Sequence, residues 1–439
     1  MKYFTQALLL LFYLFPLASS AQTTRDTVLS NATIGDCIQY AIKHQPNVQQ
    51  SLLNEQITNE TIKIKLSEWF PQLNLNYSIQ NNPQLLTAYS DGTYITSGTY
   101  NSSGLGFGLT QNIFNNDLLL AKTTAKDVRK EASQETVNNK INTAAAVSKA
   151  YYDVLLTQKQ ADVVDEDIAR LKRSLKDAYN QYQSGIVDKT DYKRATISLN
   201  NSTAQRRQIQ SEIIAKFSYL KEQMGYPDSA SLLLQYDTTQ IEKDATIDTT
   251  LAVNYDSRIE YQTLQTQKRL YAANVKYYKW SYLPTVSAFG AYNMDYLNNQ
   301  FSKLYSAVYP NSVFGLQLSV PIFQGNKRVY EVKQAQQQLQ AADINITALK
   351  NNINTEYSQA MAEYKGNLAN YLALKDNVAL ASDVYGVIRT QYQLGIKTYL
   401  DVITAESDLR SSQLNYYTSL YQLLQSKIDV QKALGILAY

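Results

Sequence analysis

Residues 181–195 read QYQSGIVDKTDYKRA and residues 391–405 read QYQLGIKTYLDVITA, so the chain carries two similar stretches 210 positions apart. Eight of the nineteen positions from 181 to 199 are identical in the second copy, where average residue usage gives about one. The identical positions are Gln181, Tyr182, Gln183, Gly185, Ile186, Asp191, Ala195 and Leu199. Gly225 and Gly435 extend the match at the same offset, which indicates an internal duplication.

Each copy is predicted to be the tip of a helical hairpin. Gly185 and Gly395 are placed to adopt the positive φ that ends a helix and turns the chain. Asp188 and Thr398 are expected to cap the helices that follow, over 189–224 and 399–434. The motif is therefore interpreted as a turn between helices and not as a catalytic loop.

Long helices are predicted before both tips. Residues 115–181 contain neither glycine nor proline, and apolar residues in 325–393 recur at the heptad spacing of coiled coils. This seam contains Val332, Ala335, Leu339, Ala342, Ile346, Leu349, Ile353, Tyr357, Tyr364, Tyr371, Val378, Tyr385 and Tyr392. At 1.5 Å per residue, each helix would be roughly 100 Å long.

Strand patterns precede the long helices. Apolar and polar residues alternate in 72–80 and 104–110, and again in 285–294 and 313–322, at lengths that suit a tilted strand in a bilayer. Four strands cannot enclose a channel, and an open sheet in lipid leaves unpaired backbone groups at its edges. Three chains would supply twelve strands, an even number that can close a barrel.

Each half thus reads helix, strand, strand, long helix, tip, helix, with leading helices over about 33–68 and 251–281. The short helices 33–68 and 189–224 together have 72 residues, against 67 in the long helix, so they are expected to stack end to end beside it. The predicted domains are a signal peptide at 1–21, a first repeat at 22–225, a connecting segment at 226–250 and a second repeat at 251–439.

Composition narrows the classes of function. The short apolar run from Ala7 to Ala18 indicates a secretory signal rather than a membrane anchor. A net charge of +3 does not suggest a nucleic-acid partner, and the single Cys37 makes no internal disulfide. Tyr77, Tyr94, Tyr292 and Tyr296 are candidates for a membrane–water interface.

The order of these motifs resembles the TolC-type outer-membrane efflux proteins, also called outer membrane factors. The resemblance covers nearly the whole mature chain. It is carried by Tyr392-x-x-Gly395-x-Lys397-x-x-x-Asp401-Val402-x-x-Ala405 and its earlier copy, by Met224-Gly225 and Leu434-Gly435, by Pro71 and Pro284, and by Ile113-Phe114 and Pro321-Ile322-Phe323.

The resemblance implies a mostly α fold with membrane β-strands, built as a homotrimer with a 12-stranded β-barrel continued by a 12-helix coiled-coil α-barrel. It implies an outer-membrane exit duct that extends into the periplasm and serves a tripartite efflux or type I secretion system. The partners would be a periplasmic adaptor (membrane fusion protein), an inner-membrane pump and outer-membrane lipid. The transported substrate and the class of pump stay open.

The resemblance also implies a periplasmic gate at the tips. Tyr392 and Lys397 would link to Asp191 of a neighbouring coil, and Asp401 would contribute to an acidic ring that favours cations. The second ring aspartate of the family falls at Thr404, so the chain departs from the pattern there, although Glu406 is near. Charge alone favours the plainer interpretation, solvated helix-surface charges; the position of these residues in duplicated tips favours a gate.

No catalytic, cofactor or metal constellation is found, and no enzyme is expected. His44 is the only histidine, which excludes a His-dependent triad or a multi-histidine metal site within one chain. Gly104, Gly106 and Gly108 lack the strand-to-helix context of a nucleotide loop and are expected to be small residues facing into the barrel. The alternative function is a non-conducting structural or adhesive periplasmic coiled coil.

Overall fold

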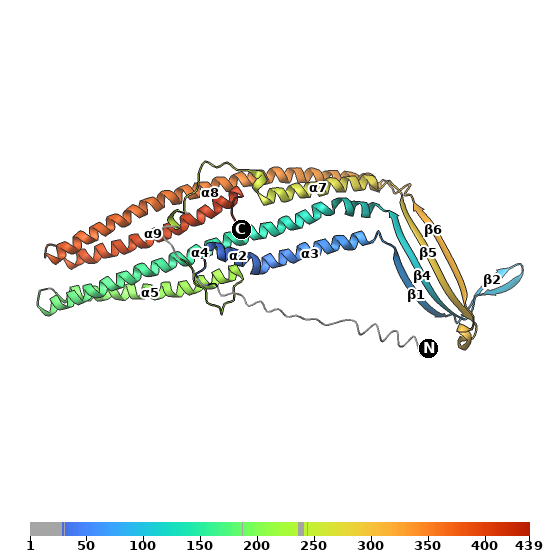
Figure 1. The fold of residues 1–439 in the computed structure, drawn as a ribbon, viewed down its shortest axis with the longest axis horizontal. Helices are drawn as coiled ribbons and strands as arrows, with labels where there is room; N and C mark the ends of the chain where they lie inside the picture. The colour runs from blue at the N-terminus through green and yellow to red at the C-terminus, as the bar shows by residue number, and fades with distance from the viewer. Residues whose placement is uncertain (1–28, 30, 187, 236–240, 244) are drawn as a thin grey trace.

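The computed structural model describes residues 29, 31–186, 188–235, 241–243 and 245–439. The predicted signal peptide lies outside the described residues, as does part of the connecting segment. The described chain is elongated, with helical hairpins at one end and a β-sheet at the other (Figure 1). None of its described helices has a stretch apolar and long enough to span a bilayer.

The same order of long elements occurs in both halves. The first half contains α2 (Ile34–His44), α3 (Pro46–Ser67), β1 (Gln72–Asn81), β2 (Leu86–Ser90), β3 (Thr93–Ser97), β4 (Asn101–Phe114), α4 (Asn116–Gln183) and α5 (Lys189–Met224). The second contains η1 (Tyr255–Ser257), α7 (Ile259–Trp280), β5 (Thr285–Asn298), η2 (Phe301–Ser306), β6 (Tyr309–Ser319), α8 (Lys327–Gln393) and α9 (Tyr399–Leu434).

The leading helices differ from their predicted bounds. The first is broken into α2 and α3 at Gln45, which has an extended backbone. The Gln45 side chain caps α3. Pro46 occupies the first position of α3, where no amide hydrogen is needed. The second begins at Ile259, after a 3-10 turn, and not near 251. Two short strands, β2 and β3, form a hairpin that the alternation pattern did not predict.

The short helices stack end to end beside the long ones, as predicted. α4 packs against both α3 and α5, and α8 packs against both α7 and α9. At the junctions, Gly225 (φ 66°) and Gly435 (φ 72°) end α5 and α9 in the left-handed conformation. A Cβ on Gly225 would lie 2.6 Å from the His44 carbonyl oxygen, and one on Gly435 2.8 Å from that of Ser257, so only glycine allows this close approach.

The heptad seam of α8 faces its neighbours along the whole helix. Every predicted seam position is buried or half-buried, and Ile353, Tyr364 and Tyr371 are among the most buried. The largest hydrophobic core lies midway along the molecule, where α2, α4, α5, α8 and α9 meet the connecting segment. There the Tyr151 hydroxyl of α4 donates a hydrogen bond to the Gln235 carbonyl oxygen at 2.8 Å.

The antiparallel sheet has the strand order β1-β4-β5-β6. Its register places Leu75 beside Phe107 and Phe107 beside Tyr292 on one face, and all three side chains are exposed in a single chain. On the other face, a Cβ on Gly106 would lie 2.5 Å from the Asn293 side-chain oxygen. The glycine therefore makes room for a polar side chain, and the two faces of the sheet differ as the alternation predicts.

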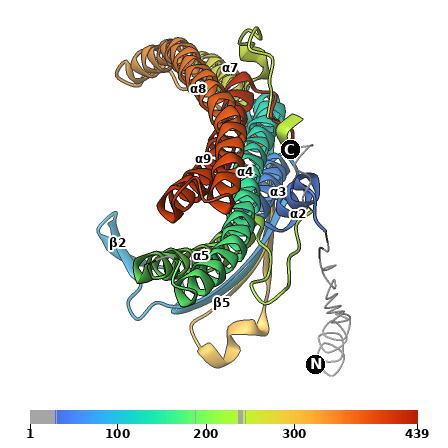
Figure 2. The ribbon, with the colours of Figure 1, turned by 90° about the vertical axis from the view of Figure 1, so that its left-hand side faces the viewer.

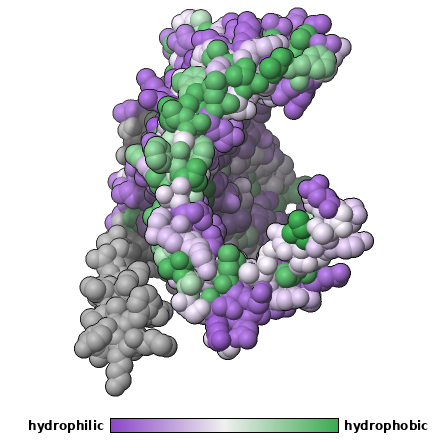
Figure 3. Space-filling model, turned by 90° about the vertical axis from the view of Figure 1, so that its right-hand side faces the viewer, coloured by the Kyte–Doolittle hydropathy of each residue, from purple (hydrophilic) through white to green (hydrophobic). Residues whose placement is uncertain are grey.

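Viewed along the long axis, the helices form an arc from α5 through α4 and α9 to α8 (Figure 2). Figure 3, which views the sheet end, shows a band of hydrophobic residues that follows this arc and mostly hydrophilic residues in its hollow. The strands β1 and β6 are the edges of the sheet and pair on one side only within the chain. One chain is thus an open segment of a curved wall.

Candidate functional site at the helical tips

Both predicted tip glycines turn the chain with the same geometry. Gly185 has φ 73° and Gly395 has φ 74°. In the first tip the amide of Ile186 donates to the Gln181 carbonyl oxygen at 2.9 Å, and in the second Ile396 donates to Gln391 in the same way. This pattern is the Schellman motif, which satisfies the last carbonyl groups of a helix. The duplicated sequence therefore encodes duplicated turns.

The helices after the tips begin at the predicted caps. The Asp188 side chain accepts a hydrogen bond from the Thr190 amide at 3.3 Å and starts α5. Thr398 and Asp401 form a reciprocal capping box at the start of α9, in which the Asp401 carboxylate accepts from the Thr398 amide at 2.9 Å and from its hydroxyl at 2.8 Å. These bonds hold the pKa of Asp401 below its ordinary value, so its carboxylate is a charged helix cap.

The two tips are joined by an aromatic cluster between α4, α5, α8 and α9. The Tyr392 hydroxyl donates a hydrogen bond to the Gln181 side-chain oxygen at 2.8 Å, and the rings of Tyr392 and Tyr399 lie 5.9 Å apart. Tyr399 is 2% exposed and packs with Ala178 and Ala195. Burial raises the pKa of Tyr392, and nearby Asp191 raises it further. Tyrosine therefore stays neutral here and acts as a hydrogen-bond donor.

The structure brings only some of the predicted gate residues together. Asp191 is half-buried and within electrostatic reach of Tyr392, whereas Lys397 is exposed on the turn. Within the described part of one chain, no ion pair joins Lys397 to Asp191. Thr404 is exposed, and its hydroxyl donates to the Leu400 carbonyl oxygen at 2.9 Å. The links to a neighbouring coil remain a prediction.

A buried charge cluster lies farther from the tips and was not found by sequence reasoning. It consists of Asp167 and Arg170 on α4, Ser202 on α5, and Glu406 and Arg410 on α9. Asp167 accepts hydrogen bonds from the Ser202 hydroxyl at 2.7 Å and from an Arg410 guanidinium nitrogen at 3.1 Å. The Arg170 Nε lies 3.4 Å from a Glu406 carboxylate oxygen. Three helices are therefore connected through charges that water scarcely reaches.

Glu406 is the buried carboxylate of this cluster that lacks hydrogen bonds. It is 2% exposed, and no hydrogen bond of good geometry reaches either carboxylate oxygen among the described residues. Burial raises its pKa to about 7, the Asp167 charge raises it too, and Arg170 and Arg410 oppose the shift. Because its side chain faces α4, Glu406 does not supply an exposed carboxylate in place of Thr404.

No group of three or more His, Cys, Asp or Glu side chains in the described residues is arranged to hold a metal ion.

The spacing of Asp167 and Arg170 on α4, and of Glu406 and Arg410 on α9, places each pair on one helix face. That spacing was the available signal for the buried charge cluster. It did not indicate that the two faces meet, because more than 230 residues separate them in sequence.

Comparison with known proteins gives consistent matches along most of the chain. The model of a family described as outer membrane efflux protein matches residues 37–225 and 273–436. The outer membrane protein TolC of Salmonella enteritidis is 22% identical over 414 residues, covering 91% of this chain and 81% of that protein. The outer membrane efflux protein BepC of Brucella suis is 22% identical, and the alignment covers 95% of this chain and 88% of that protein.

Solved structures share the fold. The outer membrane protein VceC from Vibrio cholerae superposes with a TM-score of 0.71 at 16% identity, covering 92% of this chain and 96% of that one. The MtrE outer membrane channel of Neisseria gonorrhoeae, described in its open state, gives a TM-score of 0.70 at 16% identity. The superposition covers 92% of this chain and 88% of that one.

Proposed function

Because this chain belongs to the outer membrane efflux protein family, we propose that three copies assemble into one duct with a gate at its helical tips. The protein is located in the outer membrane, extends into the periplasm and serves efflux. In the proposed trimer each chain contributes four strands to a 12-stranded barrel and four helical columns to the α-barrel. The two halves of the chain, 22–225 and 251–439, act as repeats around the connecting segment.

The sheet edges are the observation that carries this proposal. β1 and β6 each have one unpaired edge, and the apolar face that includes Leu75, Phe107 and Leu316 is exposed in a single chain. Lipid can cover the apolar face, but only another strand can satisfy the backbone groups of an edge inside a bilayer. Pairing β6 of one copy with β1 of the next satisfies both edges, and the curvature of the arc brings three copies into a ring.

The tips supply the proposed gate. The Tyr392–Gln181 hydrogen bond ties α8 to α4 within each chain, and links from Lys397 and Tyr392 to Asp191 of the next copy complete the closed ring. Single links of this kind contribute about 0.5 to 3 kcal/mol, so a partner that binds the open tips somewhat better can open them. Asp401 supplies one acidic ring, and Thr404 supplies no second one.

The partners follow from the place of the tips at the periplasmic end. We assign the opening partner to a periplasmic adaptor that connects the duct to an inner-membrane pump, in an efflux or type I secretion system. The duct itself passes substrate without catalysis. Selection of the substrate then belongs to the pump.

Disulfide crosslinking tests the assembly directly. Single cysteines are placed along β1 and β6, and the buried native Cys37 provides little competing reaction. Pairs with one cysteine on each strand should give crosslinked dimers and trimers in outer-membrane fractions, and single-cysteine controls should not. The purified protein should also form ion-conducting channels in planar bilayers. Monomers without conductance would contradict the proposal and favour a non-conducting coiled coil.

A further inference from the structure

The loop between β5 and β6 folds back onto the sheet at the end farthest from the helices. Its short 3-10 helix, η2, contacts both β4 and β5. Figure 2 shows η2, the light orange coil at the bottom of the view, outside the arc of the helices. Leu304 of η2 is 1% exposed and anchors the loop against the strands. Because the helices extend into the periplasm, this end of the sheet lies at the outer leaflet in the proposed duct.

Three tyrosines fasten η2 to the apolar face of the sheet, and we call them the tyrosine cluster. The Tyr305 hydroxyl lies 2.8 Å from that of Tyr77 on β1 and donates to the Ser103 hydroxyl on β4 at 3.3 Å. The rings of Tyr305 and Tyr296 on β5 lie 5.1 Å apart. The register places Tyr77 beside Leu105 on the apolar face. Tyrosines gather where a membrane meets water, so the cluster marks the level of the lipid headgroups.

Lys303 of η2 is the only basic residue in the part of the sequence that forms the sheet. Residues 66–121 and 280–326 contain no other lysine, arginine or histidine. The Lys303 side chain is exposed, two residues from Tyr305, and it has no ion pair in the described part of the chain. The positive charge of this region is therefore placed beside the tyrosine cluster, where a lysine can reach the charged headgroups of a membrane.

The acidic residue of the strands does not neutralise Lys303. Asp295 is the only charged residue of β1, β4, β5 and β6, and it belongs to the polar face. A Cβ on Gly104 would lie 3.1 Å from one Asp295 carboxylate oxygen on that face. The other carboxylate oxygen accepts a hydrogen bond from the Asn311 side chain at 2.8 Å. The sheet thus separates the one negative charge from the one positive charge.

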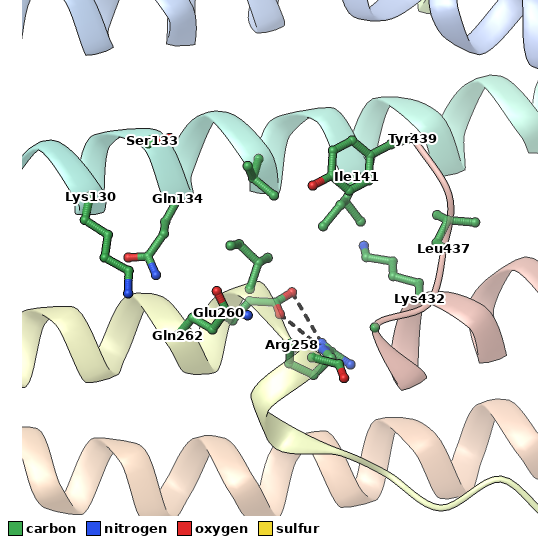
Figure 4. Close-up of a pocket in the computed structure, with 14 residues that line it drawn as sticks. Lys130, Ser133, Gln134, Ile141, Arg258, Glu260, Gln262, Lys432, Leu437 and Tyr439 are labelled. Atoms are coloured by element: carbon green, nitrogen blue, oxygen red, sulfur yellow. Dashed lines mark hydrogen bonds and ion pairs between the residues drawn. The ribbon is translucent and has the colours of Figure 1, made fainter.

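Arg258 at the start of α7 illustrates a cation that the chain itself neutralises. It is 4% exposed, and Figure 4 shows its contacts with Glu260. Its guanidinium lies 3.0 Å from the Glu260 carboxylate and 2.8 Å from that of Glu356, and it donates to the Ala433 carbonyl oxygen at 2.8 Å. No carboxylate in the described ranges takes this place for Lys303, so an anion from outside the chain can.

An exposed apolar strip begins at the tyrosine cluster. Tyr77, Leu75 and Leu73 on β1 are all exposed in a single chain, and alternate residues of a strand share one face. A membrane lipid presents groups in the same order, with a charged headgroup at the water interface and acyl chains below it. A soluble anion would leave the strip uncovered. The surface therefore matches an anionic lipid.

We propose that Lys303 and the tyrosine cluster bind the phosphate-bearing headgroup of an outer-leaflet lipid, while an acyl chain of that lipid lies along Leu75 and Leu73. The Lys303 ammonium contacts the phosphate, and the tyrosine cluster holds η2 at the level of the headgroup. One basic residue near an anionic lipid surface increases affinity about fivefold. This inference rests on the proposed duct, in which the apolar face meets lipid, and it is independent of the tip gate.

Native mass spectrometry of the purified full-length protein in detergent tests the proposal, with lipid A, which carries two phosphates, as the probe. Wild type should bind lipid A about fivefold more tightly than the same lipid with both phosphates removed. Lys303→Met should abolish this preference, and Lys303→Arg should keep it. Lys327→Met is the matched control, because Lys327 lies at the opposite end of the sheet and pairs with Glu331 at 3.7 Å. It should bind lipid A as wild type does.

Two results would overturn the proposal: equal binding of the two lipids by wild type, or an undiminished preference for the phosphates in Lys303→Met. Displacement of lipid A by millimolar inorganic phosphate would also overturn it, because the site would then recognise a free anion instead of a lipid. The same spectra report the number of subunits. A trimer without the lipid preference would therefore refute only this inference, whereas the absence of trimers would contradict the proposed duct.

Discussion

The Tyr392 hydroxyl of α8 donates a hydrogen bond to the side-chain oxygen of Gln181 on α4, with 2.8 Å between the two oxygens. Tyr392 and Gln181 belong to the two copies of the tip motif, in which Gln181-Tyr182 corresponds to Gln391-Tyr392. The bond therefore ties the tip of one half of the chain to the tip of the other. It is a direct target for testing the proposed gate.

Tyr392→Phe should increase channel opening. The substitution keeps the ring but removes a half-buried hydrogen bond worth about 0.5 to 1.5 kcal/mol, so the mean conductance in planar bilayers should rise. Tyr385→Phe, one heptad earlier on α8, is the matched control, since no hydrogen bond of its hydroxyl is found in the described residues. Wild-type conductance from an assembled Tyr392→Phe trimer would rule out this bond as a closing link.

Asp191→Ala and Lys397→Ala test the links between neighbouring copies. Each should raise conductance and the leakage of antibiotics into cells. If the two residues bind one another across the trimer, the double variant should open little more than either single variant, because each change already removes the same interaction. Fully additive effects would show that Asp191 and Lys397 act separately.

Glu406→Gln should change how stability depends on pH. Its carboxyl has an ordinary pKa of 4.5 and a pKa of about 7 in the folded protein. A raised pKa means that the folded state holds the proton more tightly, so this contribution to stability is complete below about pH 4.5 and is lost as the pH rises through 7. The variant should therefore unfold at a higher temperature than wild type at pH 8, with the difference shrinking toward pH 5.

The charged and titratable groups that face Glu406 come from α4, α8 and α9; they are Asp167, Arg170, Tyr385, Tyr399 and Arg410. They remain in the Glu406→Gln protein, so the difference from wild type isolates one carboxyl. Asp408→Asn, on the exposed face of α9, controls for general loss of negative charge. A stability difference that is the same at pH 5 and pH 8 would refute the assignment.

Asp167→Ala should be strongly destabilising. It removes the acceptor of both Ser202 and Arg410 and leaves the half-buried Arg410 guanidinium without its carboxylate partner, at a cost of about 2 to 4 kcal/mol in the free energy of unfolding. Asp165→Ala is the matched comparison, because its ion pair with Arg206 is at the surface and should contribute less than about 1 kcal/mol. Chemical unfolding in detergent measures both, and equal effects would contradict a structural role for the buried charge cluster.

Alanine in place of glycine should destabilise the protein less at a tip turn than at the point where two short helices meet. Gly395→Ala introduces only left-handed strain, about 1 kcal/mol, because no atom lies within 4 Å of the added Cβ. Gly435→Ala adds the same strain and a contact of 2.8 Å with the Ser257 carbonyl oxygen, so it should cost about 2 to 4 kcal/mol. Similar unfolding temperatures for the two variants would contradict the close approach of α9 to α7.

The elements best predicted from sequence were those with local signals at both ends. α5 and α9 have the predicted bounds, because each begins at a side-chain cap and ends at a glycine with positive φ. The β2–β3 hairpin was missed although Asp91-Gly92, both with positive φ, is a known hairpin turn signal. Its alternation spans only five residues per strand, too short to stand out from a loop.

The candidate site was only partly accessible from sequence. The tip turns follow from Gly185 and Gly395, whose conformations depend on their own backbone. The partner of Tyr392 and the neighbours of Glu406 depend instead on how α4, α8 and α9 pack, and no local pattern specifies those distances. The chain's similarity to a family predicted the duct and its location, whereas the buried charge cluster required coordinates.

The stacked columns have a mechanical consequence. α4 and α8 run unbroken from tip to sheet, whereas α5 with α3 and α9 with α7 are interrupted at Gly225 and Gly435. Within one chain, α4 and α8 are therefore the two helices whose own backbone connects a tip to the sheet, and a pull on a tip reaches the strands through them without crossing a junction between helices.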